Sequence, residues 1–210
     1  MANTSAIKII EVFADVSCPF THVGLRRLVA RRVASGRDMP VLVVRAWPLE
    51  LVNGEPLDPG FIAEEVDALR EQVAPDLFGE FDPAAFPHTS LPALALAHAS
   101  YDVDAITGER VSLALRDALF EQGRDISDPA VLAAIASGFG VAPPDDRDLR
   151  AVTAEWEEGR RRGVIGSPHF FIGASNYFCP TLHITRVDGR LQIRPDLATL
   201  ERVLVSATEG

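Results

Sequence analysis

A single cysteine–proline pair stands between an apolar strand and a helix, and this junction constrains the fold more than any other sequence feature. Residues 7–14 (IKIIEVFA) are rich in β-branched and aromatic residues, which is typical of a buried strand. Pro19 follows Cys18 where the first turn of a helix tolerates proline, and apolar residues then recur at helical spacing to about Ser35. Pro40–Ala46 (PVLVVRA) predicts a second strand. This strand–helix–strand order implies a right-handed crossover between two parallel strands.

The central part of the chain has helical periodicity and little strand character. Leu51–Gly60 (LVNGEPLDPG) is rich in turn residues and indicates a linker. The helices expected beyond it are 62–73, 91–101, 106–122, 129–139 and 146–162. These helices predict an all-helical insertion.

Strand character returns near the C-terminus. His169–Ile172 (HFFI) predicts a short buried strand. The dipeptide Asp188-Gly189 is a strong hairpin signal, and it separates two further strand candidates, 182–187 and 190–193. A last helix is expected from residue 196 to about residue 206.

The order of these elements is that of a thioredoxin fold interrupted by a helical domain. Four stretches carry a closer resemblance: Asp15-x-x-Cys18-Pro19, 45–49 (RAWPL), 120–127 (FEQGRDIS) and 163–170 (GVIGSPHF). On these stretches the chain resembles the DsbA-like superfamily. The similar branch holds FrnE-type dithiol oxidoreductases, 2-hydroxychromene-2-carboxylate isomerases and kappa-class glutathione transferases. The resemblance implies an α/β, thioredoxin-like fold. Residues 1–58 and 163–210 would form the thioredoxin-like domain, and residues 59–162 an all-helical insertion domain.

Cys18 is the predicted nucleophile. A cysteine at a helix N-terminus faces free backbone N–H groups and the positive end of the helix dipole, and both favour the thiolate. We therefore expect the pKa of Cys18 to lie below the free value of about 8.5. The alternative is a buried, inert core cysteine, because free cysteine is among the most buried residue types.

Thr21 replaces a second cysteine. The resemblance identifies this position as that of the resolving cysteine, which in dithiol members attacks the mixed disulfide and releases product. The Thr21 hydroxyl cannot do so, although it lies one turn into the helix and is able to donate a hydrogen bond to the Cys18 sulfur. Alternatively, Thr21 is only a helix-start residue. Any disulfide on Cys18 must then be resolved by another molecule or by Cys179.

Ser167-Pro168 is the expected partner of this junction. The resemblance implies that Pro168 is the cis-proline that lies against the reactive sulfur in thioredoxin folds. Its preceding residue, Ser167, would then offer its N–H and C=O to an extended substrate, a form of strand addition. The alternative is an ordinary proline at the start of a strand.

Further residues are expected to contact substrate. His22 lies four residues after Cys18, where a charged imidazole would lower the pKa of the thiol, or where it is simply a solvated first-turn residue. Relatives usually carry a pocket-lining asparagine at the position of His88. The predicted substrate-binding residues are Pro19, Phe20, His22, Trp47, His88, Ser167 and Pro168.

Cys179 lies where glutathione-using relatives carry a segment that helps to bind the γ-glutamyl end, but residues 176–181 depart from that pattern. A disulfide between Cys18 and Cys179 requires Cα atoms within about 7 Å. A buried spectator thiol is the favoured alternative.

Charge and composition exclude several classes of function. The formal net charge of −10 argues against nucleic acid and anionic membrane surfaces as partners. The N-terminus lacks the features of a secretory signal, which favours a cytoplasmic protein. Two separated cysteines and no H-x-x-x-H spacing argue against a metal site, and the absence of a glycine-rich phosphate loop argues against nucleotides.

These inferences favour a thiol–disulfide oxidoreductase that acts through Cys18 and an external thiol, with Thr21 beside it. No tightly bound cofactor is expected. The cosubstrate would be a low-molecular-weight thiol, glutathione or an equivalent. The expected partners are a small thiol or disulfide, with a second copy of the chain as a further candidate. One alternative is a glutathione-dependent transferase or isomerase, although those relatives mostly carry serine in place of Cys18. The other is a catalytically silent binding module with a thioredoxin fold.

Overall fold

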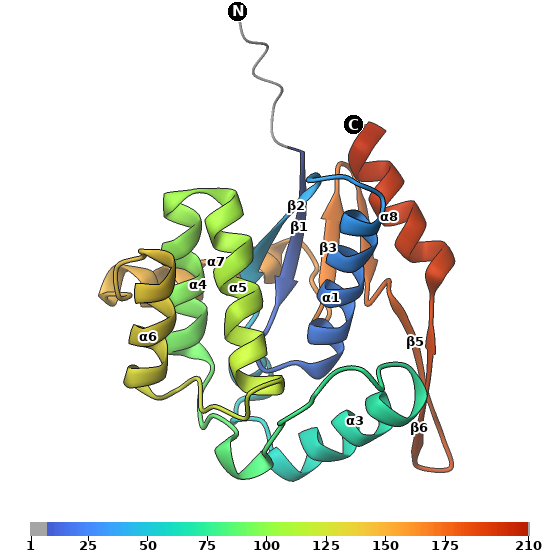
Figure 1. Ribbon diagram of the computed structural model, residues 1–210, viewed down its shortest axis with the longest axis horizontal. Helices are drawn as coiled ribbons and strands as arrows, with labels where there is room; N and C mark the ends of the chain where they lie inside the picture. The colour runs from blue at the N-terminus through green and yellow to red at the C-terminus, as the bar shows by residue number, and fades with distance from the viewer. Residues whose placement is uncertain (1–7, 210) are drawn as a thin grey trace, which may run out of the picture.

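The computed structural model describes residues 8–209, with side chains to residue 206, and centres on a mixed sheet in the order β2-β1-β3-β4 (Figure 1). β1 (Ile9–Ala14) pairs in parallel with β2 (Val41–Ala46), and α1 (Pro19–Ala34) connects them. β1 also pairs antiparallel with β3 (His169–Ile172), which pairs antiparallel with β4 (Ser175–Phe178). The expected parallel pair is confirmed.

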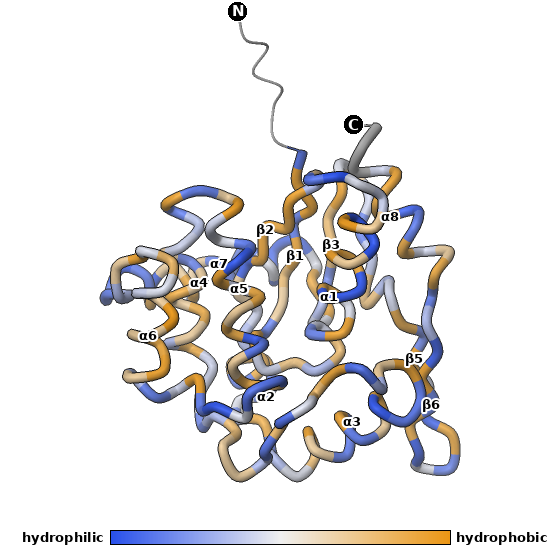
Figure 2. The backbone as a smooth tube through the Cα atoms, viewed as in Figure 1, coloured by the Kyte–Doolittle hydropathy of each residue, from blue (hydrophilic) through white to orange (hydrophobic). Residues whose placement is uncertain are grey.

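Alternating side chains of β1 build two hydrophobic layers, one on each face of the sheet. Ile10, Val12 and Ala14 belong to a buried cluster with α1 and α8 (Leu197–Glu209). Phe13 points to the opposite face, as the period of two in a strand requires. Figure 2 shows hydrophobic residues concentrated along the central strands.

The chain between β2 and β3 forms helices, some of which pack beside β2 (Figure 1). They are α2 (Leu49–Asn53), α3 (Pro59–Gln72), η1 (Pro83–Ala85), α4 (Leu91–Val103), α5 (Ala105–Phe120), α6 (Pro129–Phe139) and α7 (Asp146–Arg161). No strand occurs between β2 and β3 within the described chain, so the fold is the α/β, thioredoxin-like fold with a helical insertion. The apolar cluster of these helices also includes Val16 and Val23, so it is continuous with the start of α1.

Side chains from the helical segment satisfy the outer edge of β2. The backbone N–H groups of Leu42, Val44 and Ala46 would otherwise lack partners, because β2 is an edge strand. They donate instead to Glu109 Oε2 at 2.6 Å, Tyr101 Oη at 2.9 Å and Glu155 Oε2 at 2.7 Å, respectively. Three helices thus replace the missing neighbouring strand and fix the insertion against the sheet.

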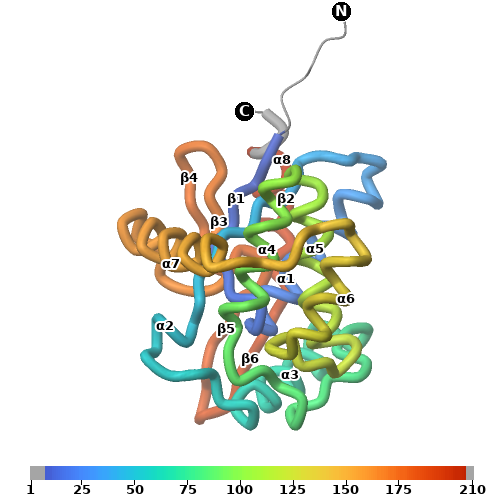
Figure 3. Tube along the Cα trace, turned by 90° about the vertical axis from the view of Figure 1, so that its left-hand side faces the viewer, coloured from blue at the N-terminus to red at the C-terminus, as the bar shows by residue number. Residues whose placement is uncertain are grey.

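The hairpin expected around Asp188-Gly189 is confirmed. β5 (Leu182–Val187) and β6 (Arg190–Pro195) form a separate two-stranded sheet. Gln72 at the end of α3 hydrogen-bonds to the backbone of β6, accepting from Ile193 N at 2.8 Å and donating to Leu191 O at 3.1 Å. Figures 1 and 3 both show α3 and this hairpin at the same end of the molecule.

Two elements differ from the sequence expectation. β4 follows β3 as the outer strand of the main sheet, although its sequence SNYF gives little strand signal. α2 occupies the start of the segment expected to be a linker, which ends where α3 begins at Pro59.

Residues 1–7, with the expected start of the first strand, lie outside the described residues. Within the described chain, no helix has the length and apolarity to cross a membrane.

Replacing Glu109 with glutamine should destabilise the fold, because Glu109 pairs with the buried guanidinium of Arg32 and also accepts from β2. Breaking a buried ion pair from one side costs about 3–5 kcal/mol. The matched control, Glu201→Gln, removes the exposed pair with Arg31 and should cost less than about 1 kcal/mol. Urea unfolding measures both, and equal losses would contradict this role of Glu109.

Candidate active site

Cys18 is the N-cap of α1. Its backbone is extended, with φ −85° and ψ 115°, and Pro19 occupies the first turn of the helix. No acidic residue lies in that turn, and Cys18 O accepts from His22 N at 3.1 Å as the first helical hydrogen bond. The thiol therefore lies beside the free N–H groups of the helix start, as the sequence predicts.

The segment before β3 comes directly against this thiol. The Ser167–Pro168 peptide bond is cis, and Cys18 Sγ donates to Ser167 O at 3.3 Å. The hydroxyls of Thr21 and Ser167 are 2.9 Å apart, and Asp15 N donates to Ser167 Oγ at 2.9 Å. The structure thus brings together Cys18, Thr21, Ser167 and Pro168 from opposite ends of the chain.

The pKa of the Cys18 thiol is raised above its ordinary value, whereas the helix-start argument predicts a lowered one. Burial is the largest cause, since only 4% of Cys18 is exposed. Hydrogen bonds from Thr21 and from the Ser167 side chain lower the pKa of Cys18, but burial outweighs them. The prediction of a lowered pKa is therefore wrong for this conformation, in which Cys18 is a protonated thiol at neutral pH.

Glu65 on α3 adds to this effect. Its negative charge raises the pKa of Cys18, so the carboxyl group lies within electrostatic range of the thiol. Burial raises the pKa of Glu65 itself to about 7, although the nearby Arg186 opposes the shift. No sequence signal indicates this role, because Glu65 adjoins Glu64 and acidic pairs on helices normally face solvent.

The buried carboxylate of Asp15 ties the surrounding loops together. It accepts from Ser17 N at 2.8 Å, Leu49 N at 2.6 Å and Ser90 Oγ at 3.1 Å. Arg116 donates to Asp15 O at 3.2 Å. Sequence reasoning assigned Asp15 no role, and its only signal was its place in the motif with Cys18.

A small cavity lies beside the Cys18 loop. It has a volume of about 10 Å³, room for one water molecule, and is lined by Asp15, Ser17, Glu50, Leu57, Phe86, Pro87, His88, Thr89 and Ser90. The Ser17 hydroxyl is buried and has no hydrogen-bond partner among the described residues. His88 Nδ1 lies 2.9 Å from Ser127 Oγ at the same cavity. The structure thus places His88 next to the loop that carries the thiol.

Three of the other expected contact residues pack into the protein. His22 is fully buried, contacts the rings of Phe78 and Phe120, and lies 2.6 Å from Glu121 Oε1. Burial lowers the pKa of His22, so it supplies no positive charge to Cys18 at neutral pH. Phe20 is half-buried against the main apolar cluster.

Trp47 likewise lies in the hydrophobic layer under α7. It packs with Phe13 and Val164, and a Cβ at Gly159 would come within 2.7 Å of its ring. The structure therefore does not favour substrate contact for Trp47 or His22, because both side chains are buried.

Residues 9–192 match the DSBA-like thioredoxin domain. The chain belongs to the DSBA-like thioredoxin domain family. No curated protein matches its sequence.

Solved structures resemble this family member in fold. A 2-hydroxychromene-2-carboxylate isomerase has a TM-score of 0.62 at 12% identity, covering 81% of this chain and 88% of that one. Cytosolic disulfide reductase DsbM from Pseudomonas aeruginosa has a TM-score of 0.57 at 16% identity, covering 96% of both chains, and is also known with GSH. A probable DsbA oxidoreductase from Streptomyces coelicolor has a TM-score of 0.63 at 19% identity, covering 96% of this chain and 91% of that one. At these identities the likeness shows the fold alone.

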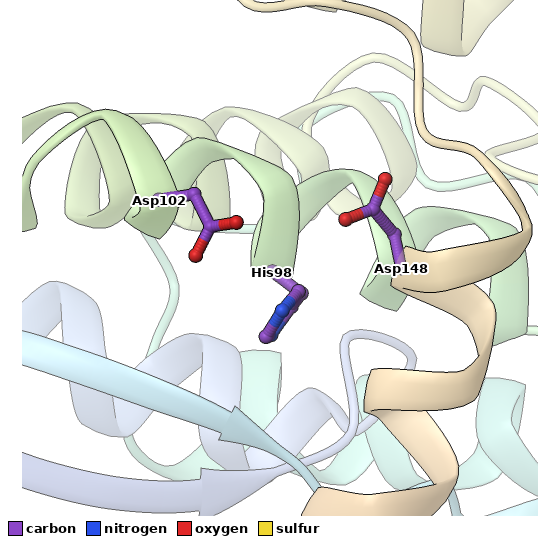
Figure 4. Close-up of side chains that lie close together, drawn as sticks. All are labelled: His98, Asp102 and Asp148. Carbon is purple, nitrogen blue, oxygen red and sulfur yellow. The ribbon is translucent and has the colours of Figure 1, made fainter.

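This DSBA-like protein has a second cluster of polar side chains, away from Cys18 (Figure 4). His98 and Asp102 from α4 and Asp148 from α7 place potential metal-ligand atoms within 4.8 Å of one another. Each has a protein partner: His98 Nδ1 lies 3.3 Å from Glu155 Oε1, Asp102 pairs with Arg147, and Asp148 accepts a backbone N–H in the α7 capping box. We therefore assign no metal to this cluster.

Alkylation of Cys18 should be slow at neutral pH and should accelerate only above the pKa of a free cysteine thiol, because burial disfavours the thiolate. Thr21→Val removes a hydroxyl that lowers this pKa and should shift the rate profile to still higher pH. Thr21→Ser keeps the hydroxyl and is the matched control. Iodoacetamide labelling followed by peptide mass spectrometry measures the profile, and a native midpoint below that of free cysteine would contradict the assignment.

Proposed function

We propose that the protein is a thiol–disulfide oxidoreductase in which Cys18 is the attacking thiol and a low-molecular-weight thiol, such as glutathione, is the cosubstrate. The observation that carries the proposal is the contact of Cys18 Sγ with Ser167 O, at 3.3 Å, beside a cis-proline and a helix start. Family membership supports thiol chemistry, and the DsbM structure with GSH suggests glutathione as the thiol. DsbM is cytosolic, which supports a cytoplasmic setting as part of the proposal.

Substrate binding would activate the thiol. An extended disulfide substrate that adds as a strand beside Ser167 uses the same carbonyl that accepts the Cys18 S–H. Once this acceptor is taken, the hydrogen bonds from Thr21 favour the thiolate. Cys18 then attacks one sulfur of the substrate, forms a mixed disulfide, and releases the other half as a thiolate.

Thr21 leaves the second step to another thiol. Because its hydroxyl cannot attack a disulfide, an external thiolate would attack the mixed disulfide and regenerate Cys18.

Two other functions make different demands on Cys18. A glutathione-dependent isomerase or transferase activates the glutathione sulfur and does not need a protein thiol, and the fold likeness to the isomerase is the observation in its favour. A silent binding module is favoured by the burial of Cys18. Substitution of Cys18 separates these functions.

Cys18→Ser should reduce glutathione-dependent reduction of hydroxyethyl disulfide to the uncatalysed rate, because the attacking sulfur is lost. Thr21→Cys should gain insulin-reducing activity, because it restores a dithiol at the helix start. Thermal unfolding of each variant checks that the fold is kept. If a folded Cys18→Ser protein reduces hydroxyethyl disulfide at the wild-type rate, the proposal is wrong. Retained glutathione transfer in that variant would favour the isomerase class.

A further inference from the structure

The second cysteine lies across the cis-proline from Cys18. Phe178, the last residue of β4, pairs with His169, the first residue of β3, so Cys179 continues this register opposite Pro168. Cys179 N donates to Pro168 O at 2.9 Å, and Cys18 Sγ donates to Ser167 O at 3.3 Å. Both cysteines therefore hydrogen-bond to carbonyls of adjacent residues in one short segment.

The backbone at Cys179 is held in an uncommon conformation. Its φ is +44°, in the left-handed region that non-glycine residues rarely adopt. A hydrogen bond on each side holds it there, from Cys179 N to Pro168 O at 2.9 Å and from Leu182 N to Cys179 O at 3.3 Å. Such residues are often found at functional sites, and here the two hydrogen bonds fix the backbone of Cys179 beside Pro168.

Both thiols are free, and they share one electrostatic environment. Cys179 is 6% exposed and belongs to the apolar cluster that includes Val16, close to Cys18 in sequence. Burial raises the pKa of Cys179 to about 12, and the negative charge of Cys18 is the next cause. The two sulfurs are thus close enough for the charge on one to affect the other.

We propose that Cys179 resolves the mixed disulfide on Cys18 before the external thiol does, and that the external thiol then reduces the intramolecular Cys18–Cys179 disulfide. This inference rests on the proposed function, because Cys18 must first form a mixed disulfide with a substrate thiol. The Cys179 sulfur then attacks Cys18 Sγ, forms the Cys18–Cys179 bond, and breaks the bond to the substrate sulfur. The proton of Cys179 leaves with the substrate, which departs as a reduced thiol.

The mixed disulfide itself removes one obstacle to this step. While Cys18 is a thiolate, its charge opposes ionisation of Cys179, but in a mixed disulfide that charge is absent. The hydrogen bonds to adjacent carbonyls place both residues at one short segment, which favours closure of the disulfide. Cys179, directly after β4, would thus take the role of the resolving cysteine that is missing at Thr21 in the helix.

Glutathione disulfide tests the proposal directly. The reduced full-length protein is mixed with it, quenched with acid, and analysed by intact mass and non-reducing peptide mapping. The wild type should lose two hydrogens, carry no glutathione, and yield a linked peptide pair containing Cys18 and Cys179. Cys179→Ser and Cys179→Ala should instead accumulate one stable glutathione adduct on Cys18. Thermal unfolding checks that both variants fold. The peptide map of the wild type tests the disulfide without relying on either variant.

The outcomes separate the two levels of the proposal. A stable adduct on Cys18 in the wild type, as abundant as in Cys179→Ser, would overturn the role of Cys179 and leave the proposed function intact. Absence of any adduct on Cys18 in the folded Cys179 variants would remove the proposed function, and the resolving step with it. Cys18→Ser should give neither product, and an adduct on Cys179 in that variant would count against Cys18 as the attacking thiol.

Discussion

The buried carboxylate of Asp15 is the interaction on which the geometry of the site depends. It accepts hydrogen bonds from the loop before α1, from the start of α2 and from Ser90, which precedes α4. The N–H of the same residue holds the Ser167 hydroxyl, and its carbonyl accepts from Arg116. One residue therefore positions the thiol loop, the cis-proline segment and the helical insertion relative to one another.

This arrangement is stabilised at a cost in desolvation. Burial raises the pKa of Asp15, although its hydrogen bonds and the charge of Arg116 lower it. Burial also lowers the pKa of Arg116, so each charge needs the other. Buried polar contacts also hold the edge of β2, where the carboxylates of Glu109 and Glu155 accept hydrogen bonds from strand N–H groups. The insertion is thus fixed by specific polar contacts as well as by apolar packing.

The elements with strong local signals were predictable from sequence, and those that depend on distant contacts were not. Pro129–Phe139 matches α6 because Asp128 caps its start and Gly140 ends it in the left-handed conformation. β4 escaped prediction because SNYF is mostly exposed, and an exposed outer strand needs few apolar residues. Those local signals say nothing about which side chains fold back onto the sheet.

The same limit applies to the site. The position of Cys18 follows from local sequence, and its proximity to Pro168 followed from the family resemblance. The direction of its pKa did not, because the helix-start argument omits the burial that segments distant in sequence impose on the thiol. His22 shows the same effect: its spacing from Cys18 on the helix was correct, but that face packs against Phe78 and Phe120.

The Ser167 carbonyl links these observations into one chemical constraint. It is the acceptor of the Cys18 S–H, and the proposed strand addition would use it for substrate. A thiol held protonated by burial is protected from adventitious oxidation, because the thiolate is the reactive form. Occupation of that carbonyl by a substrate would remove the hydrogen bond that favours the protonated thiol, while the donors at the helix start remain. Under the proposed function, binding and activation would therefore be coupled through the backbone oxygen of Ser167.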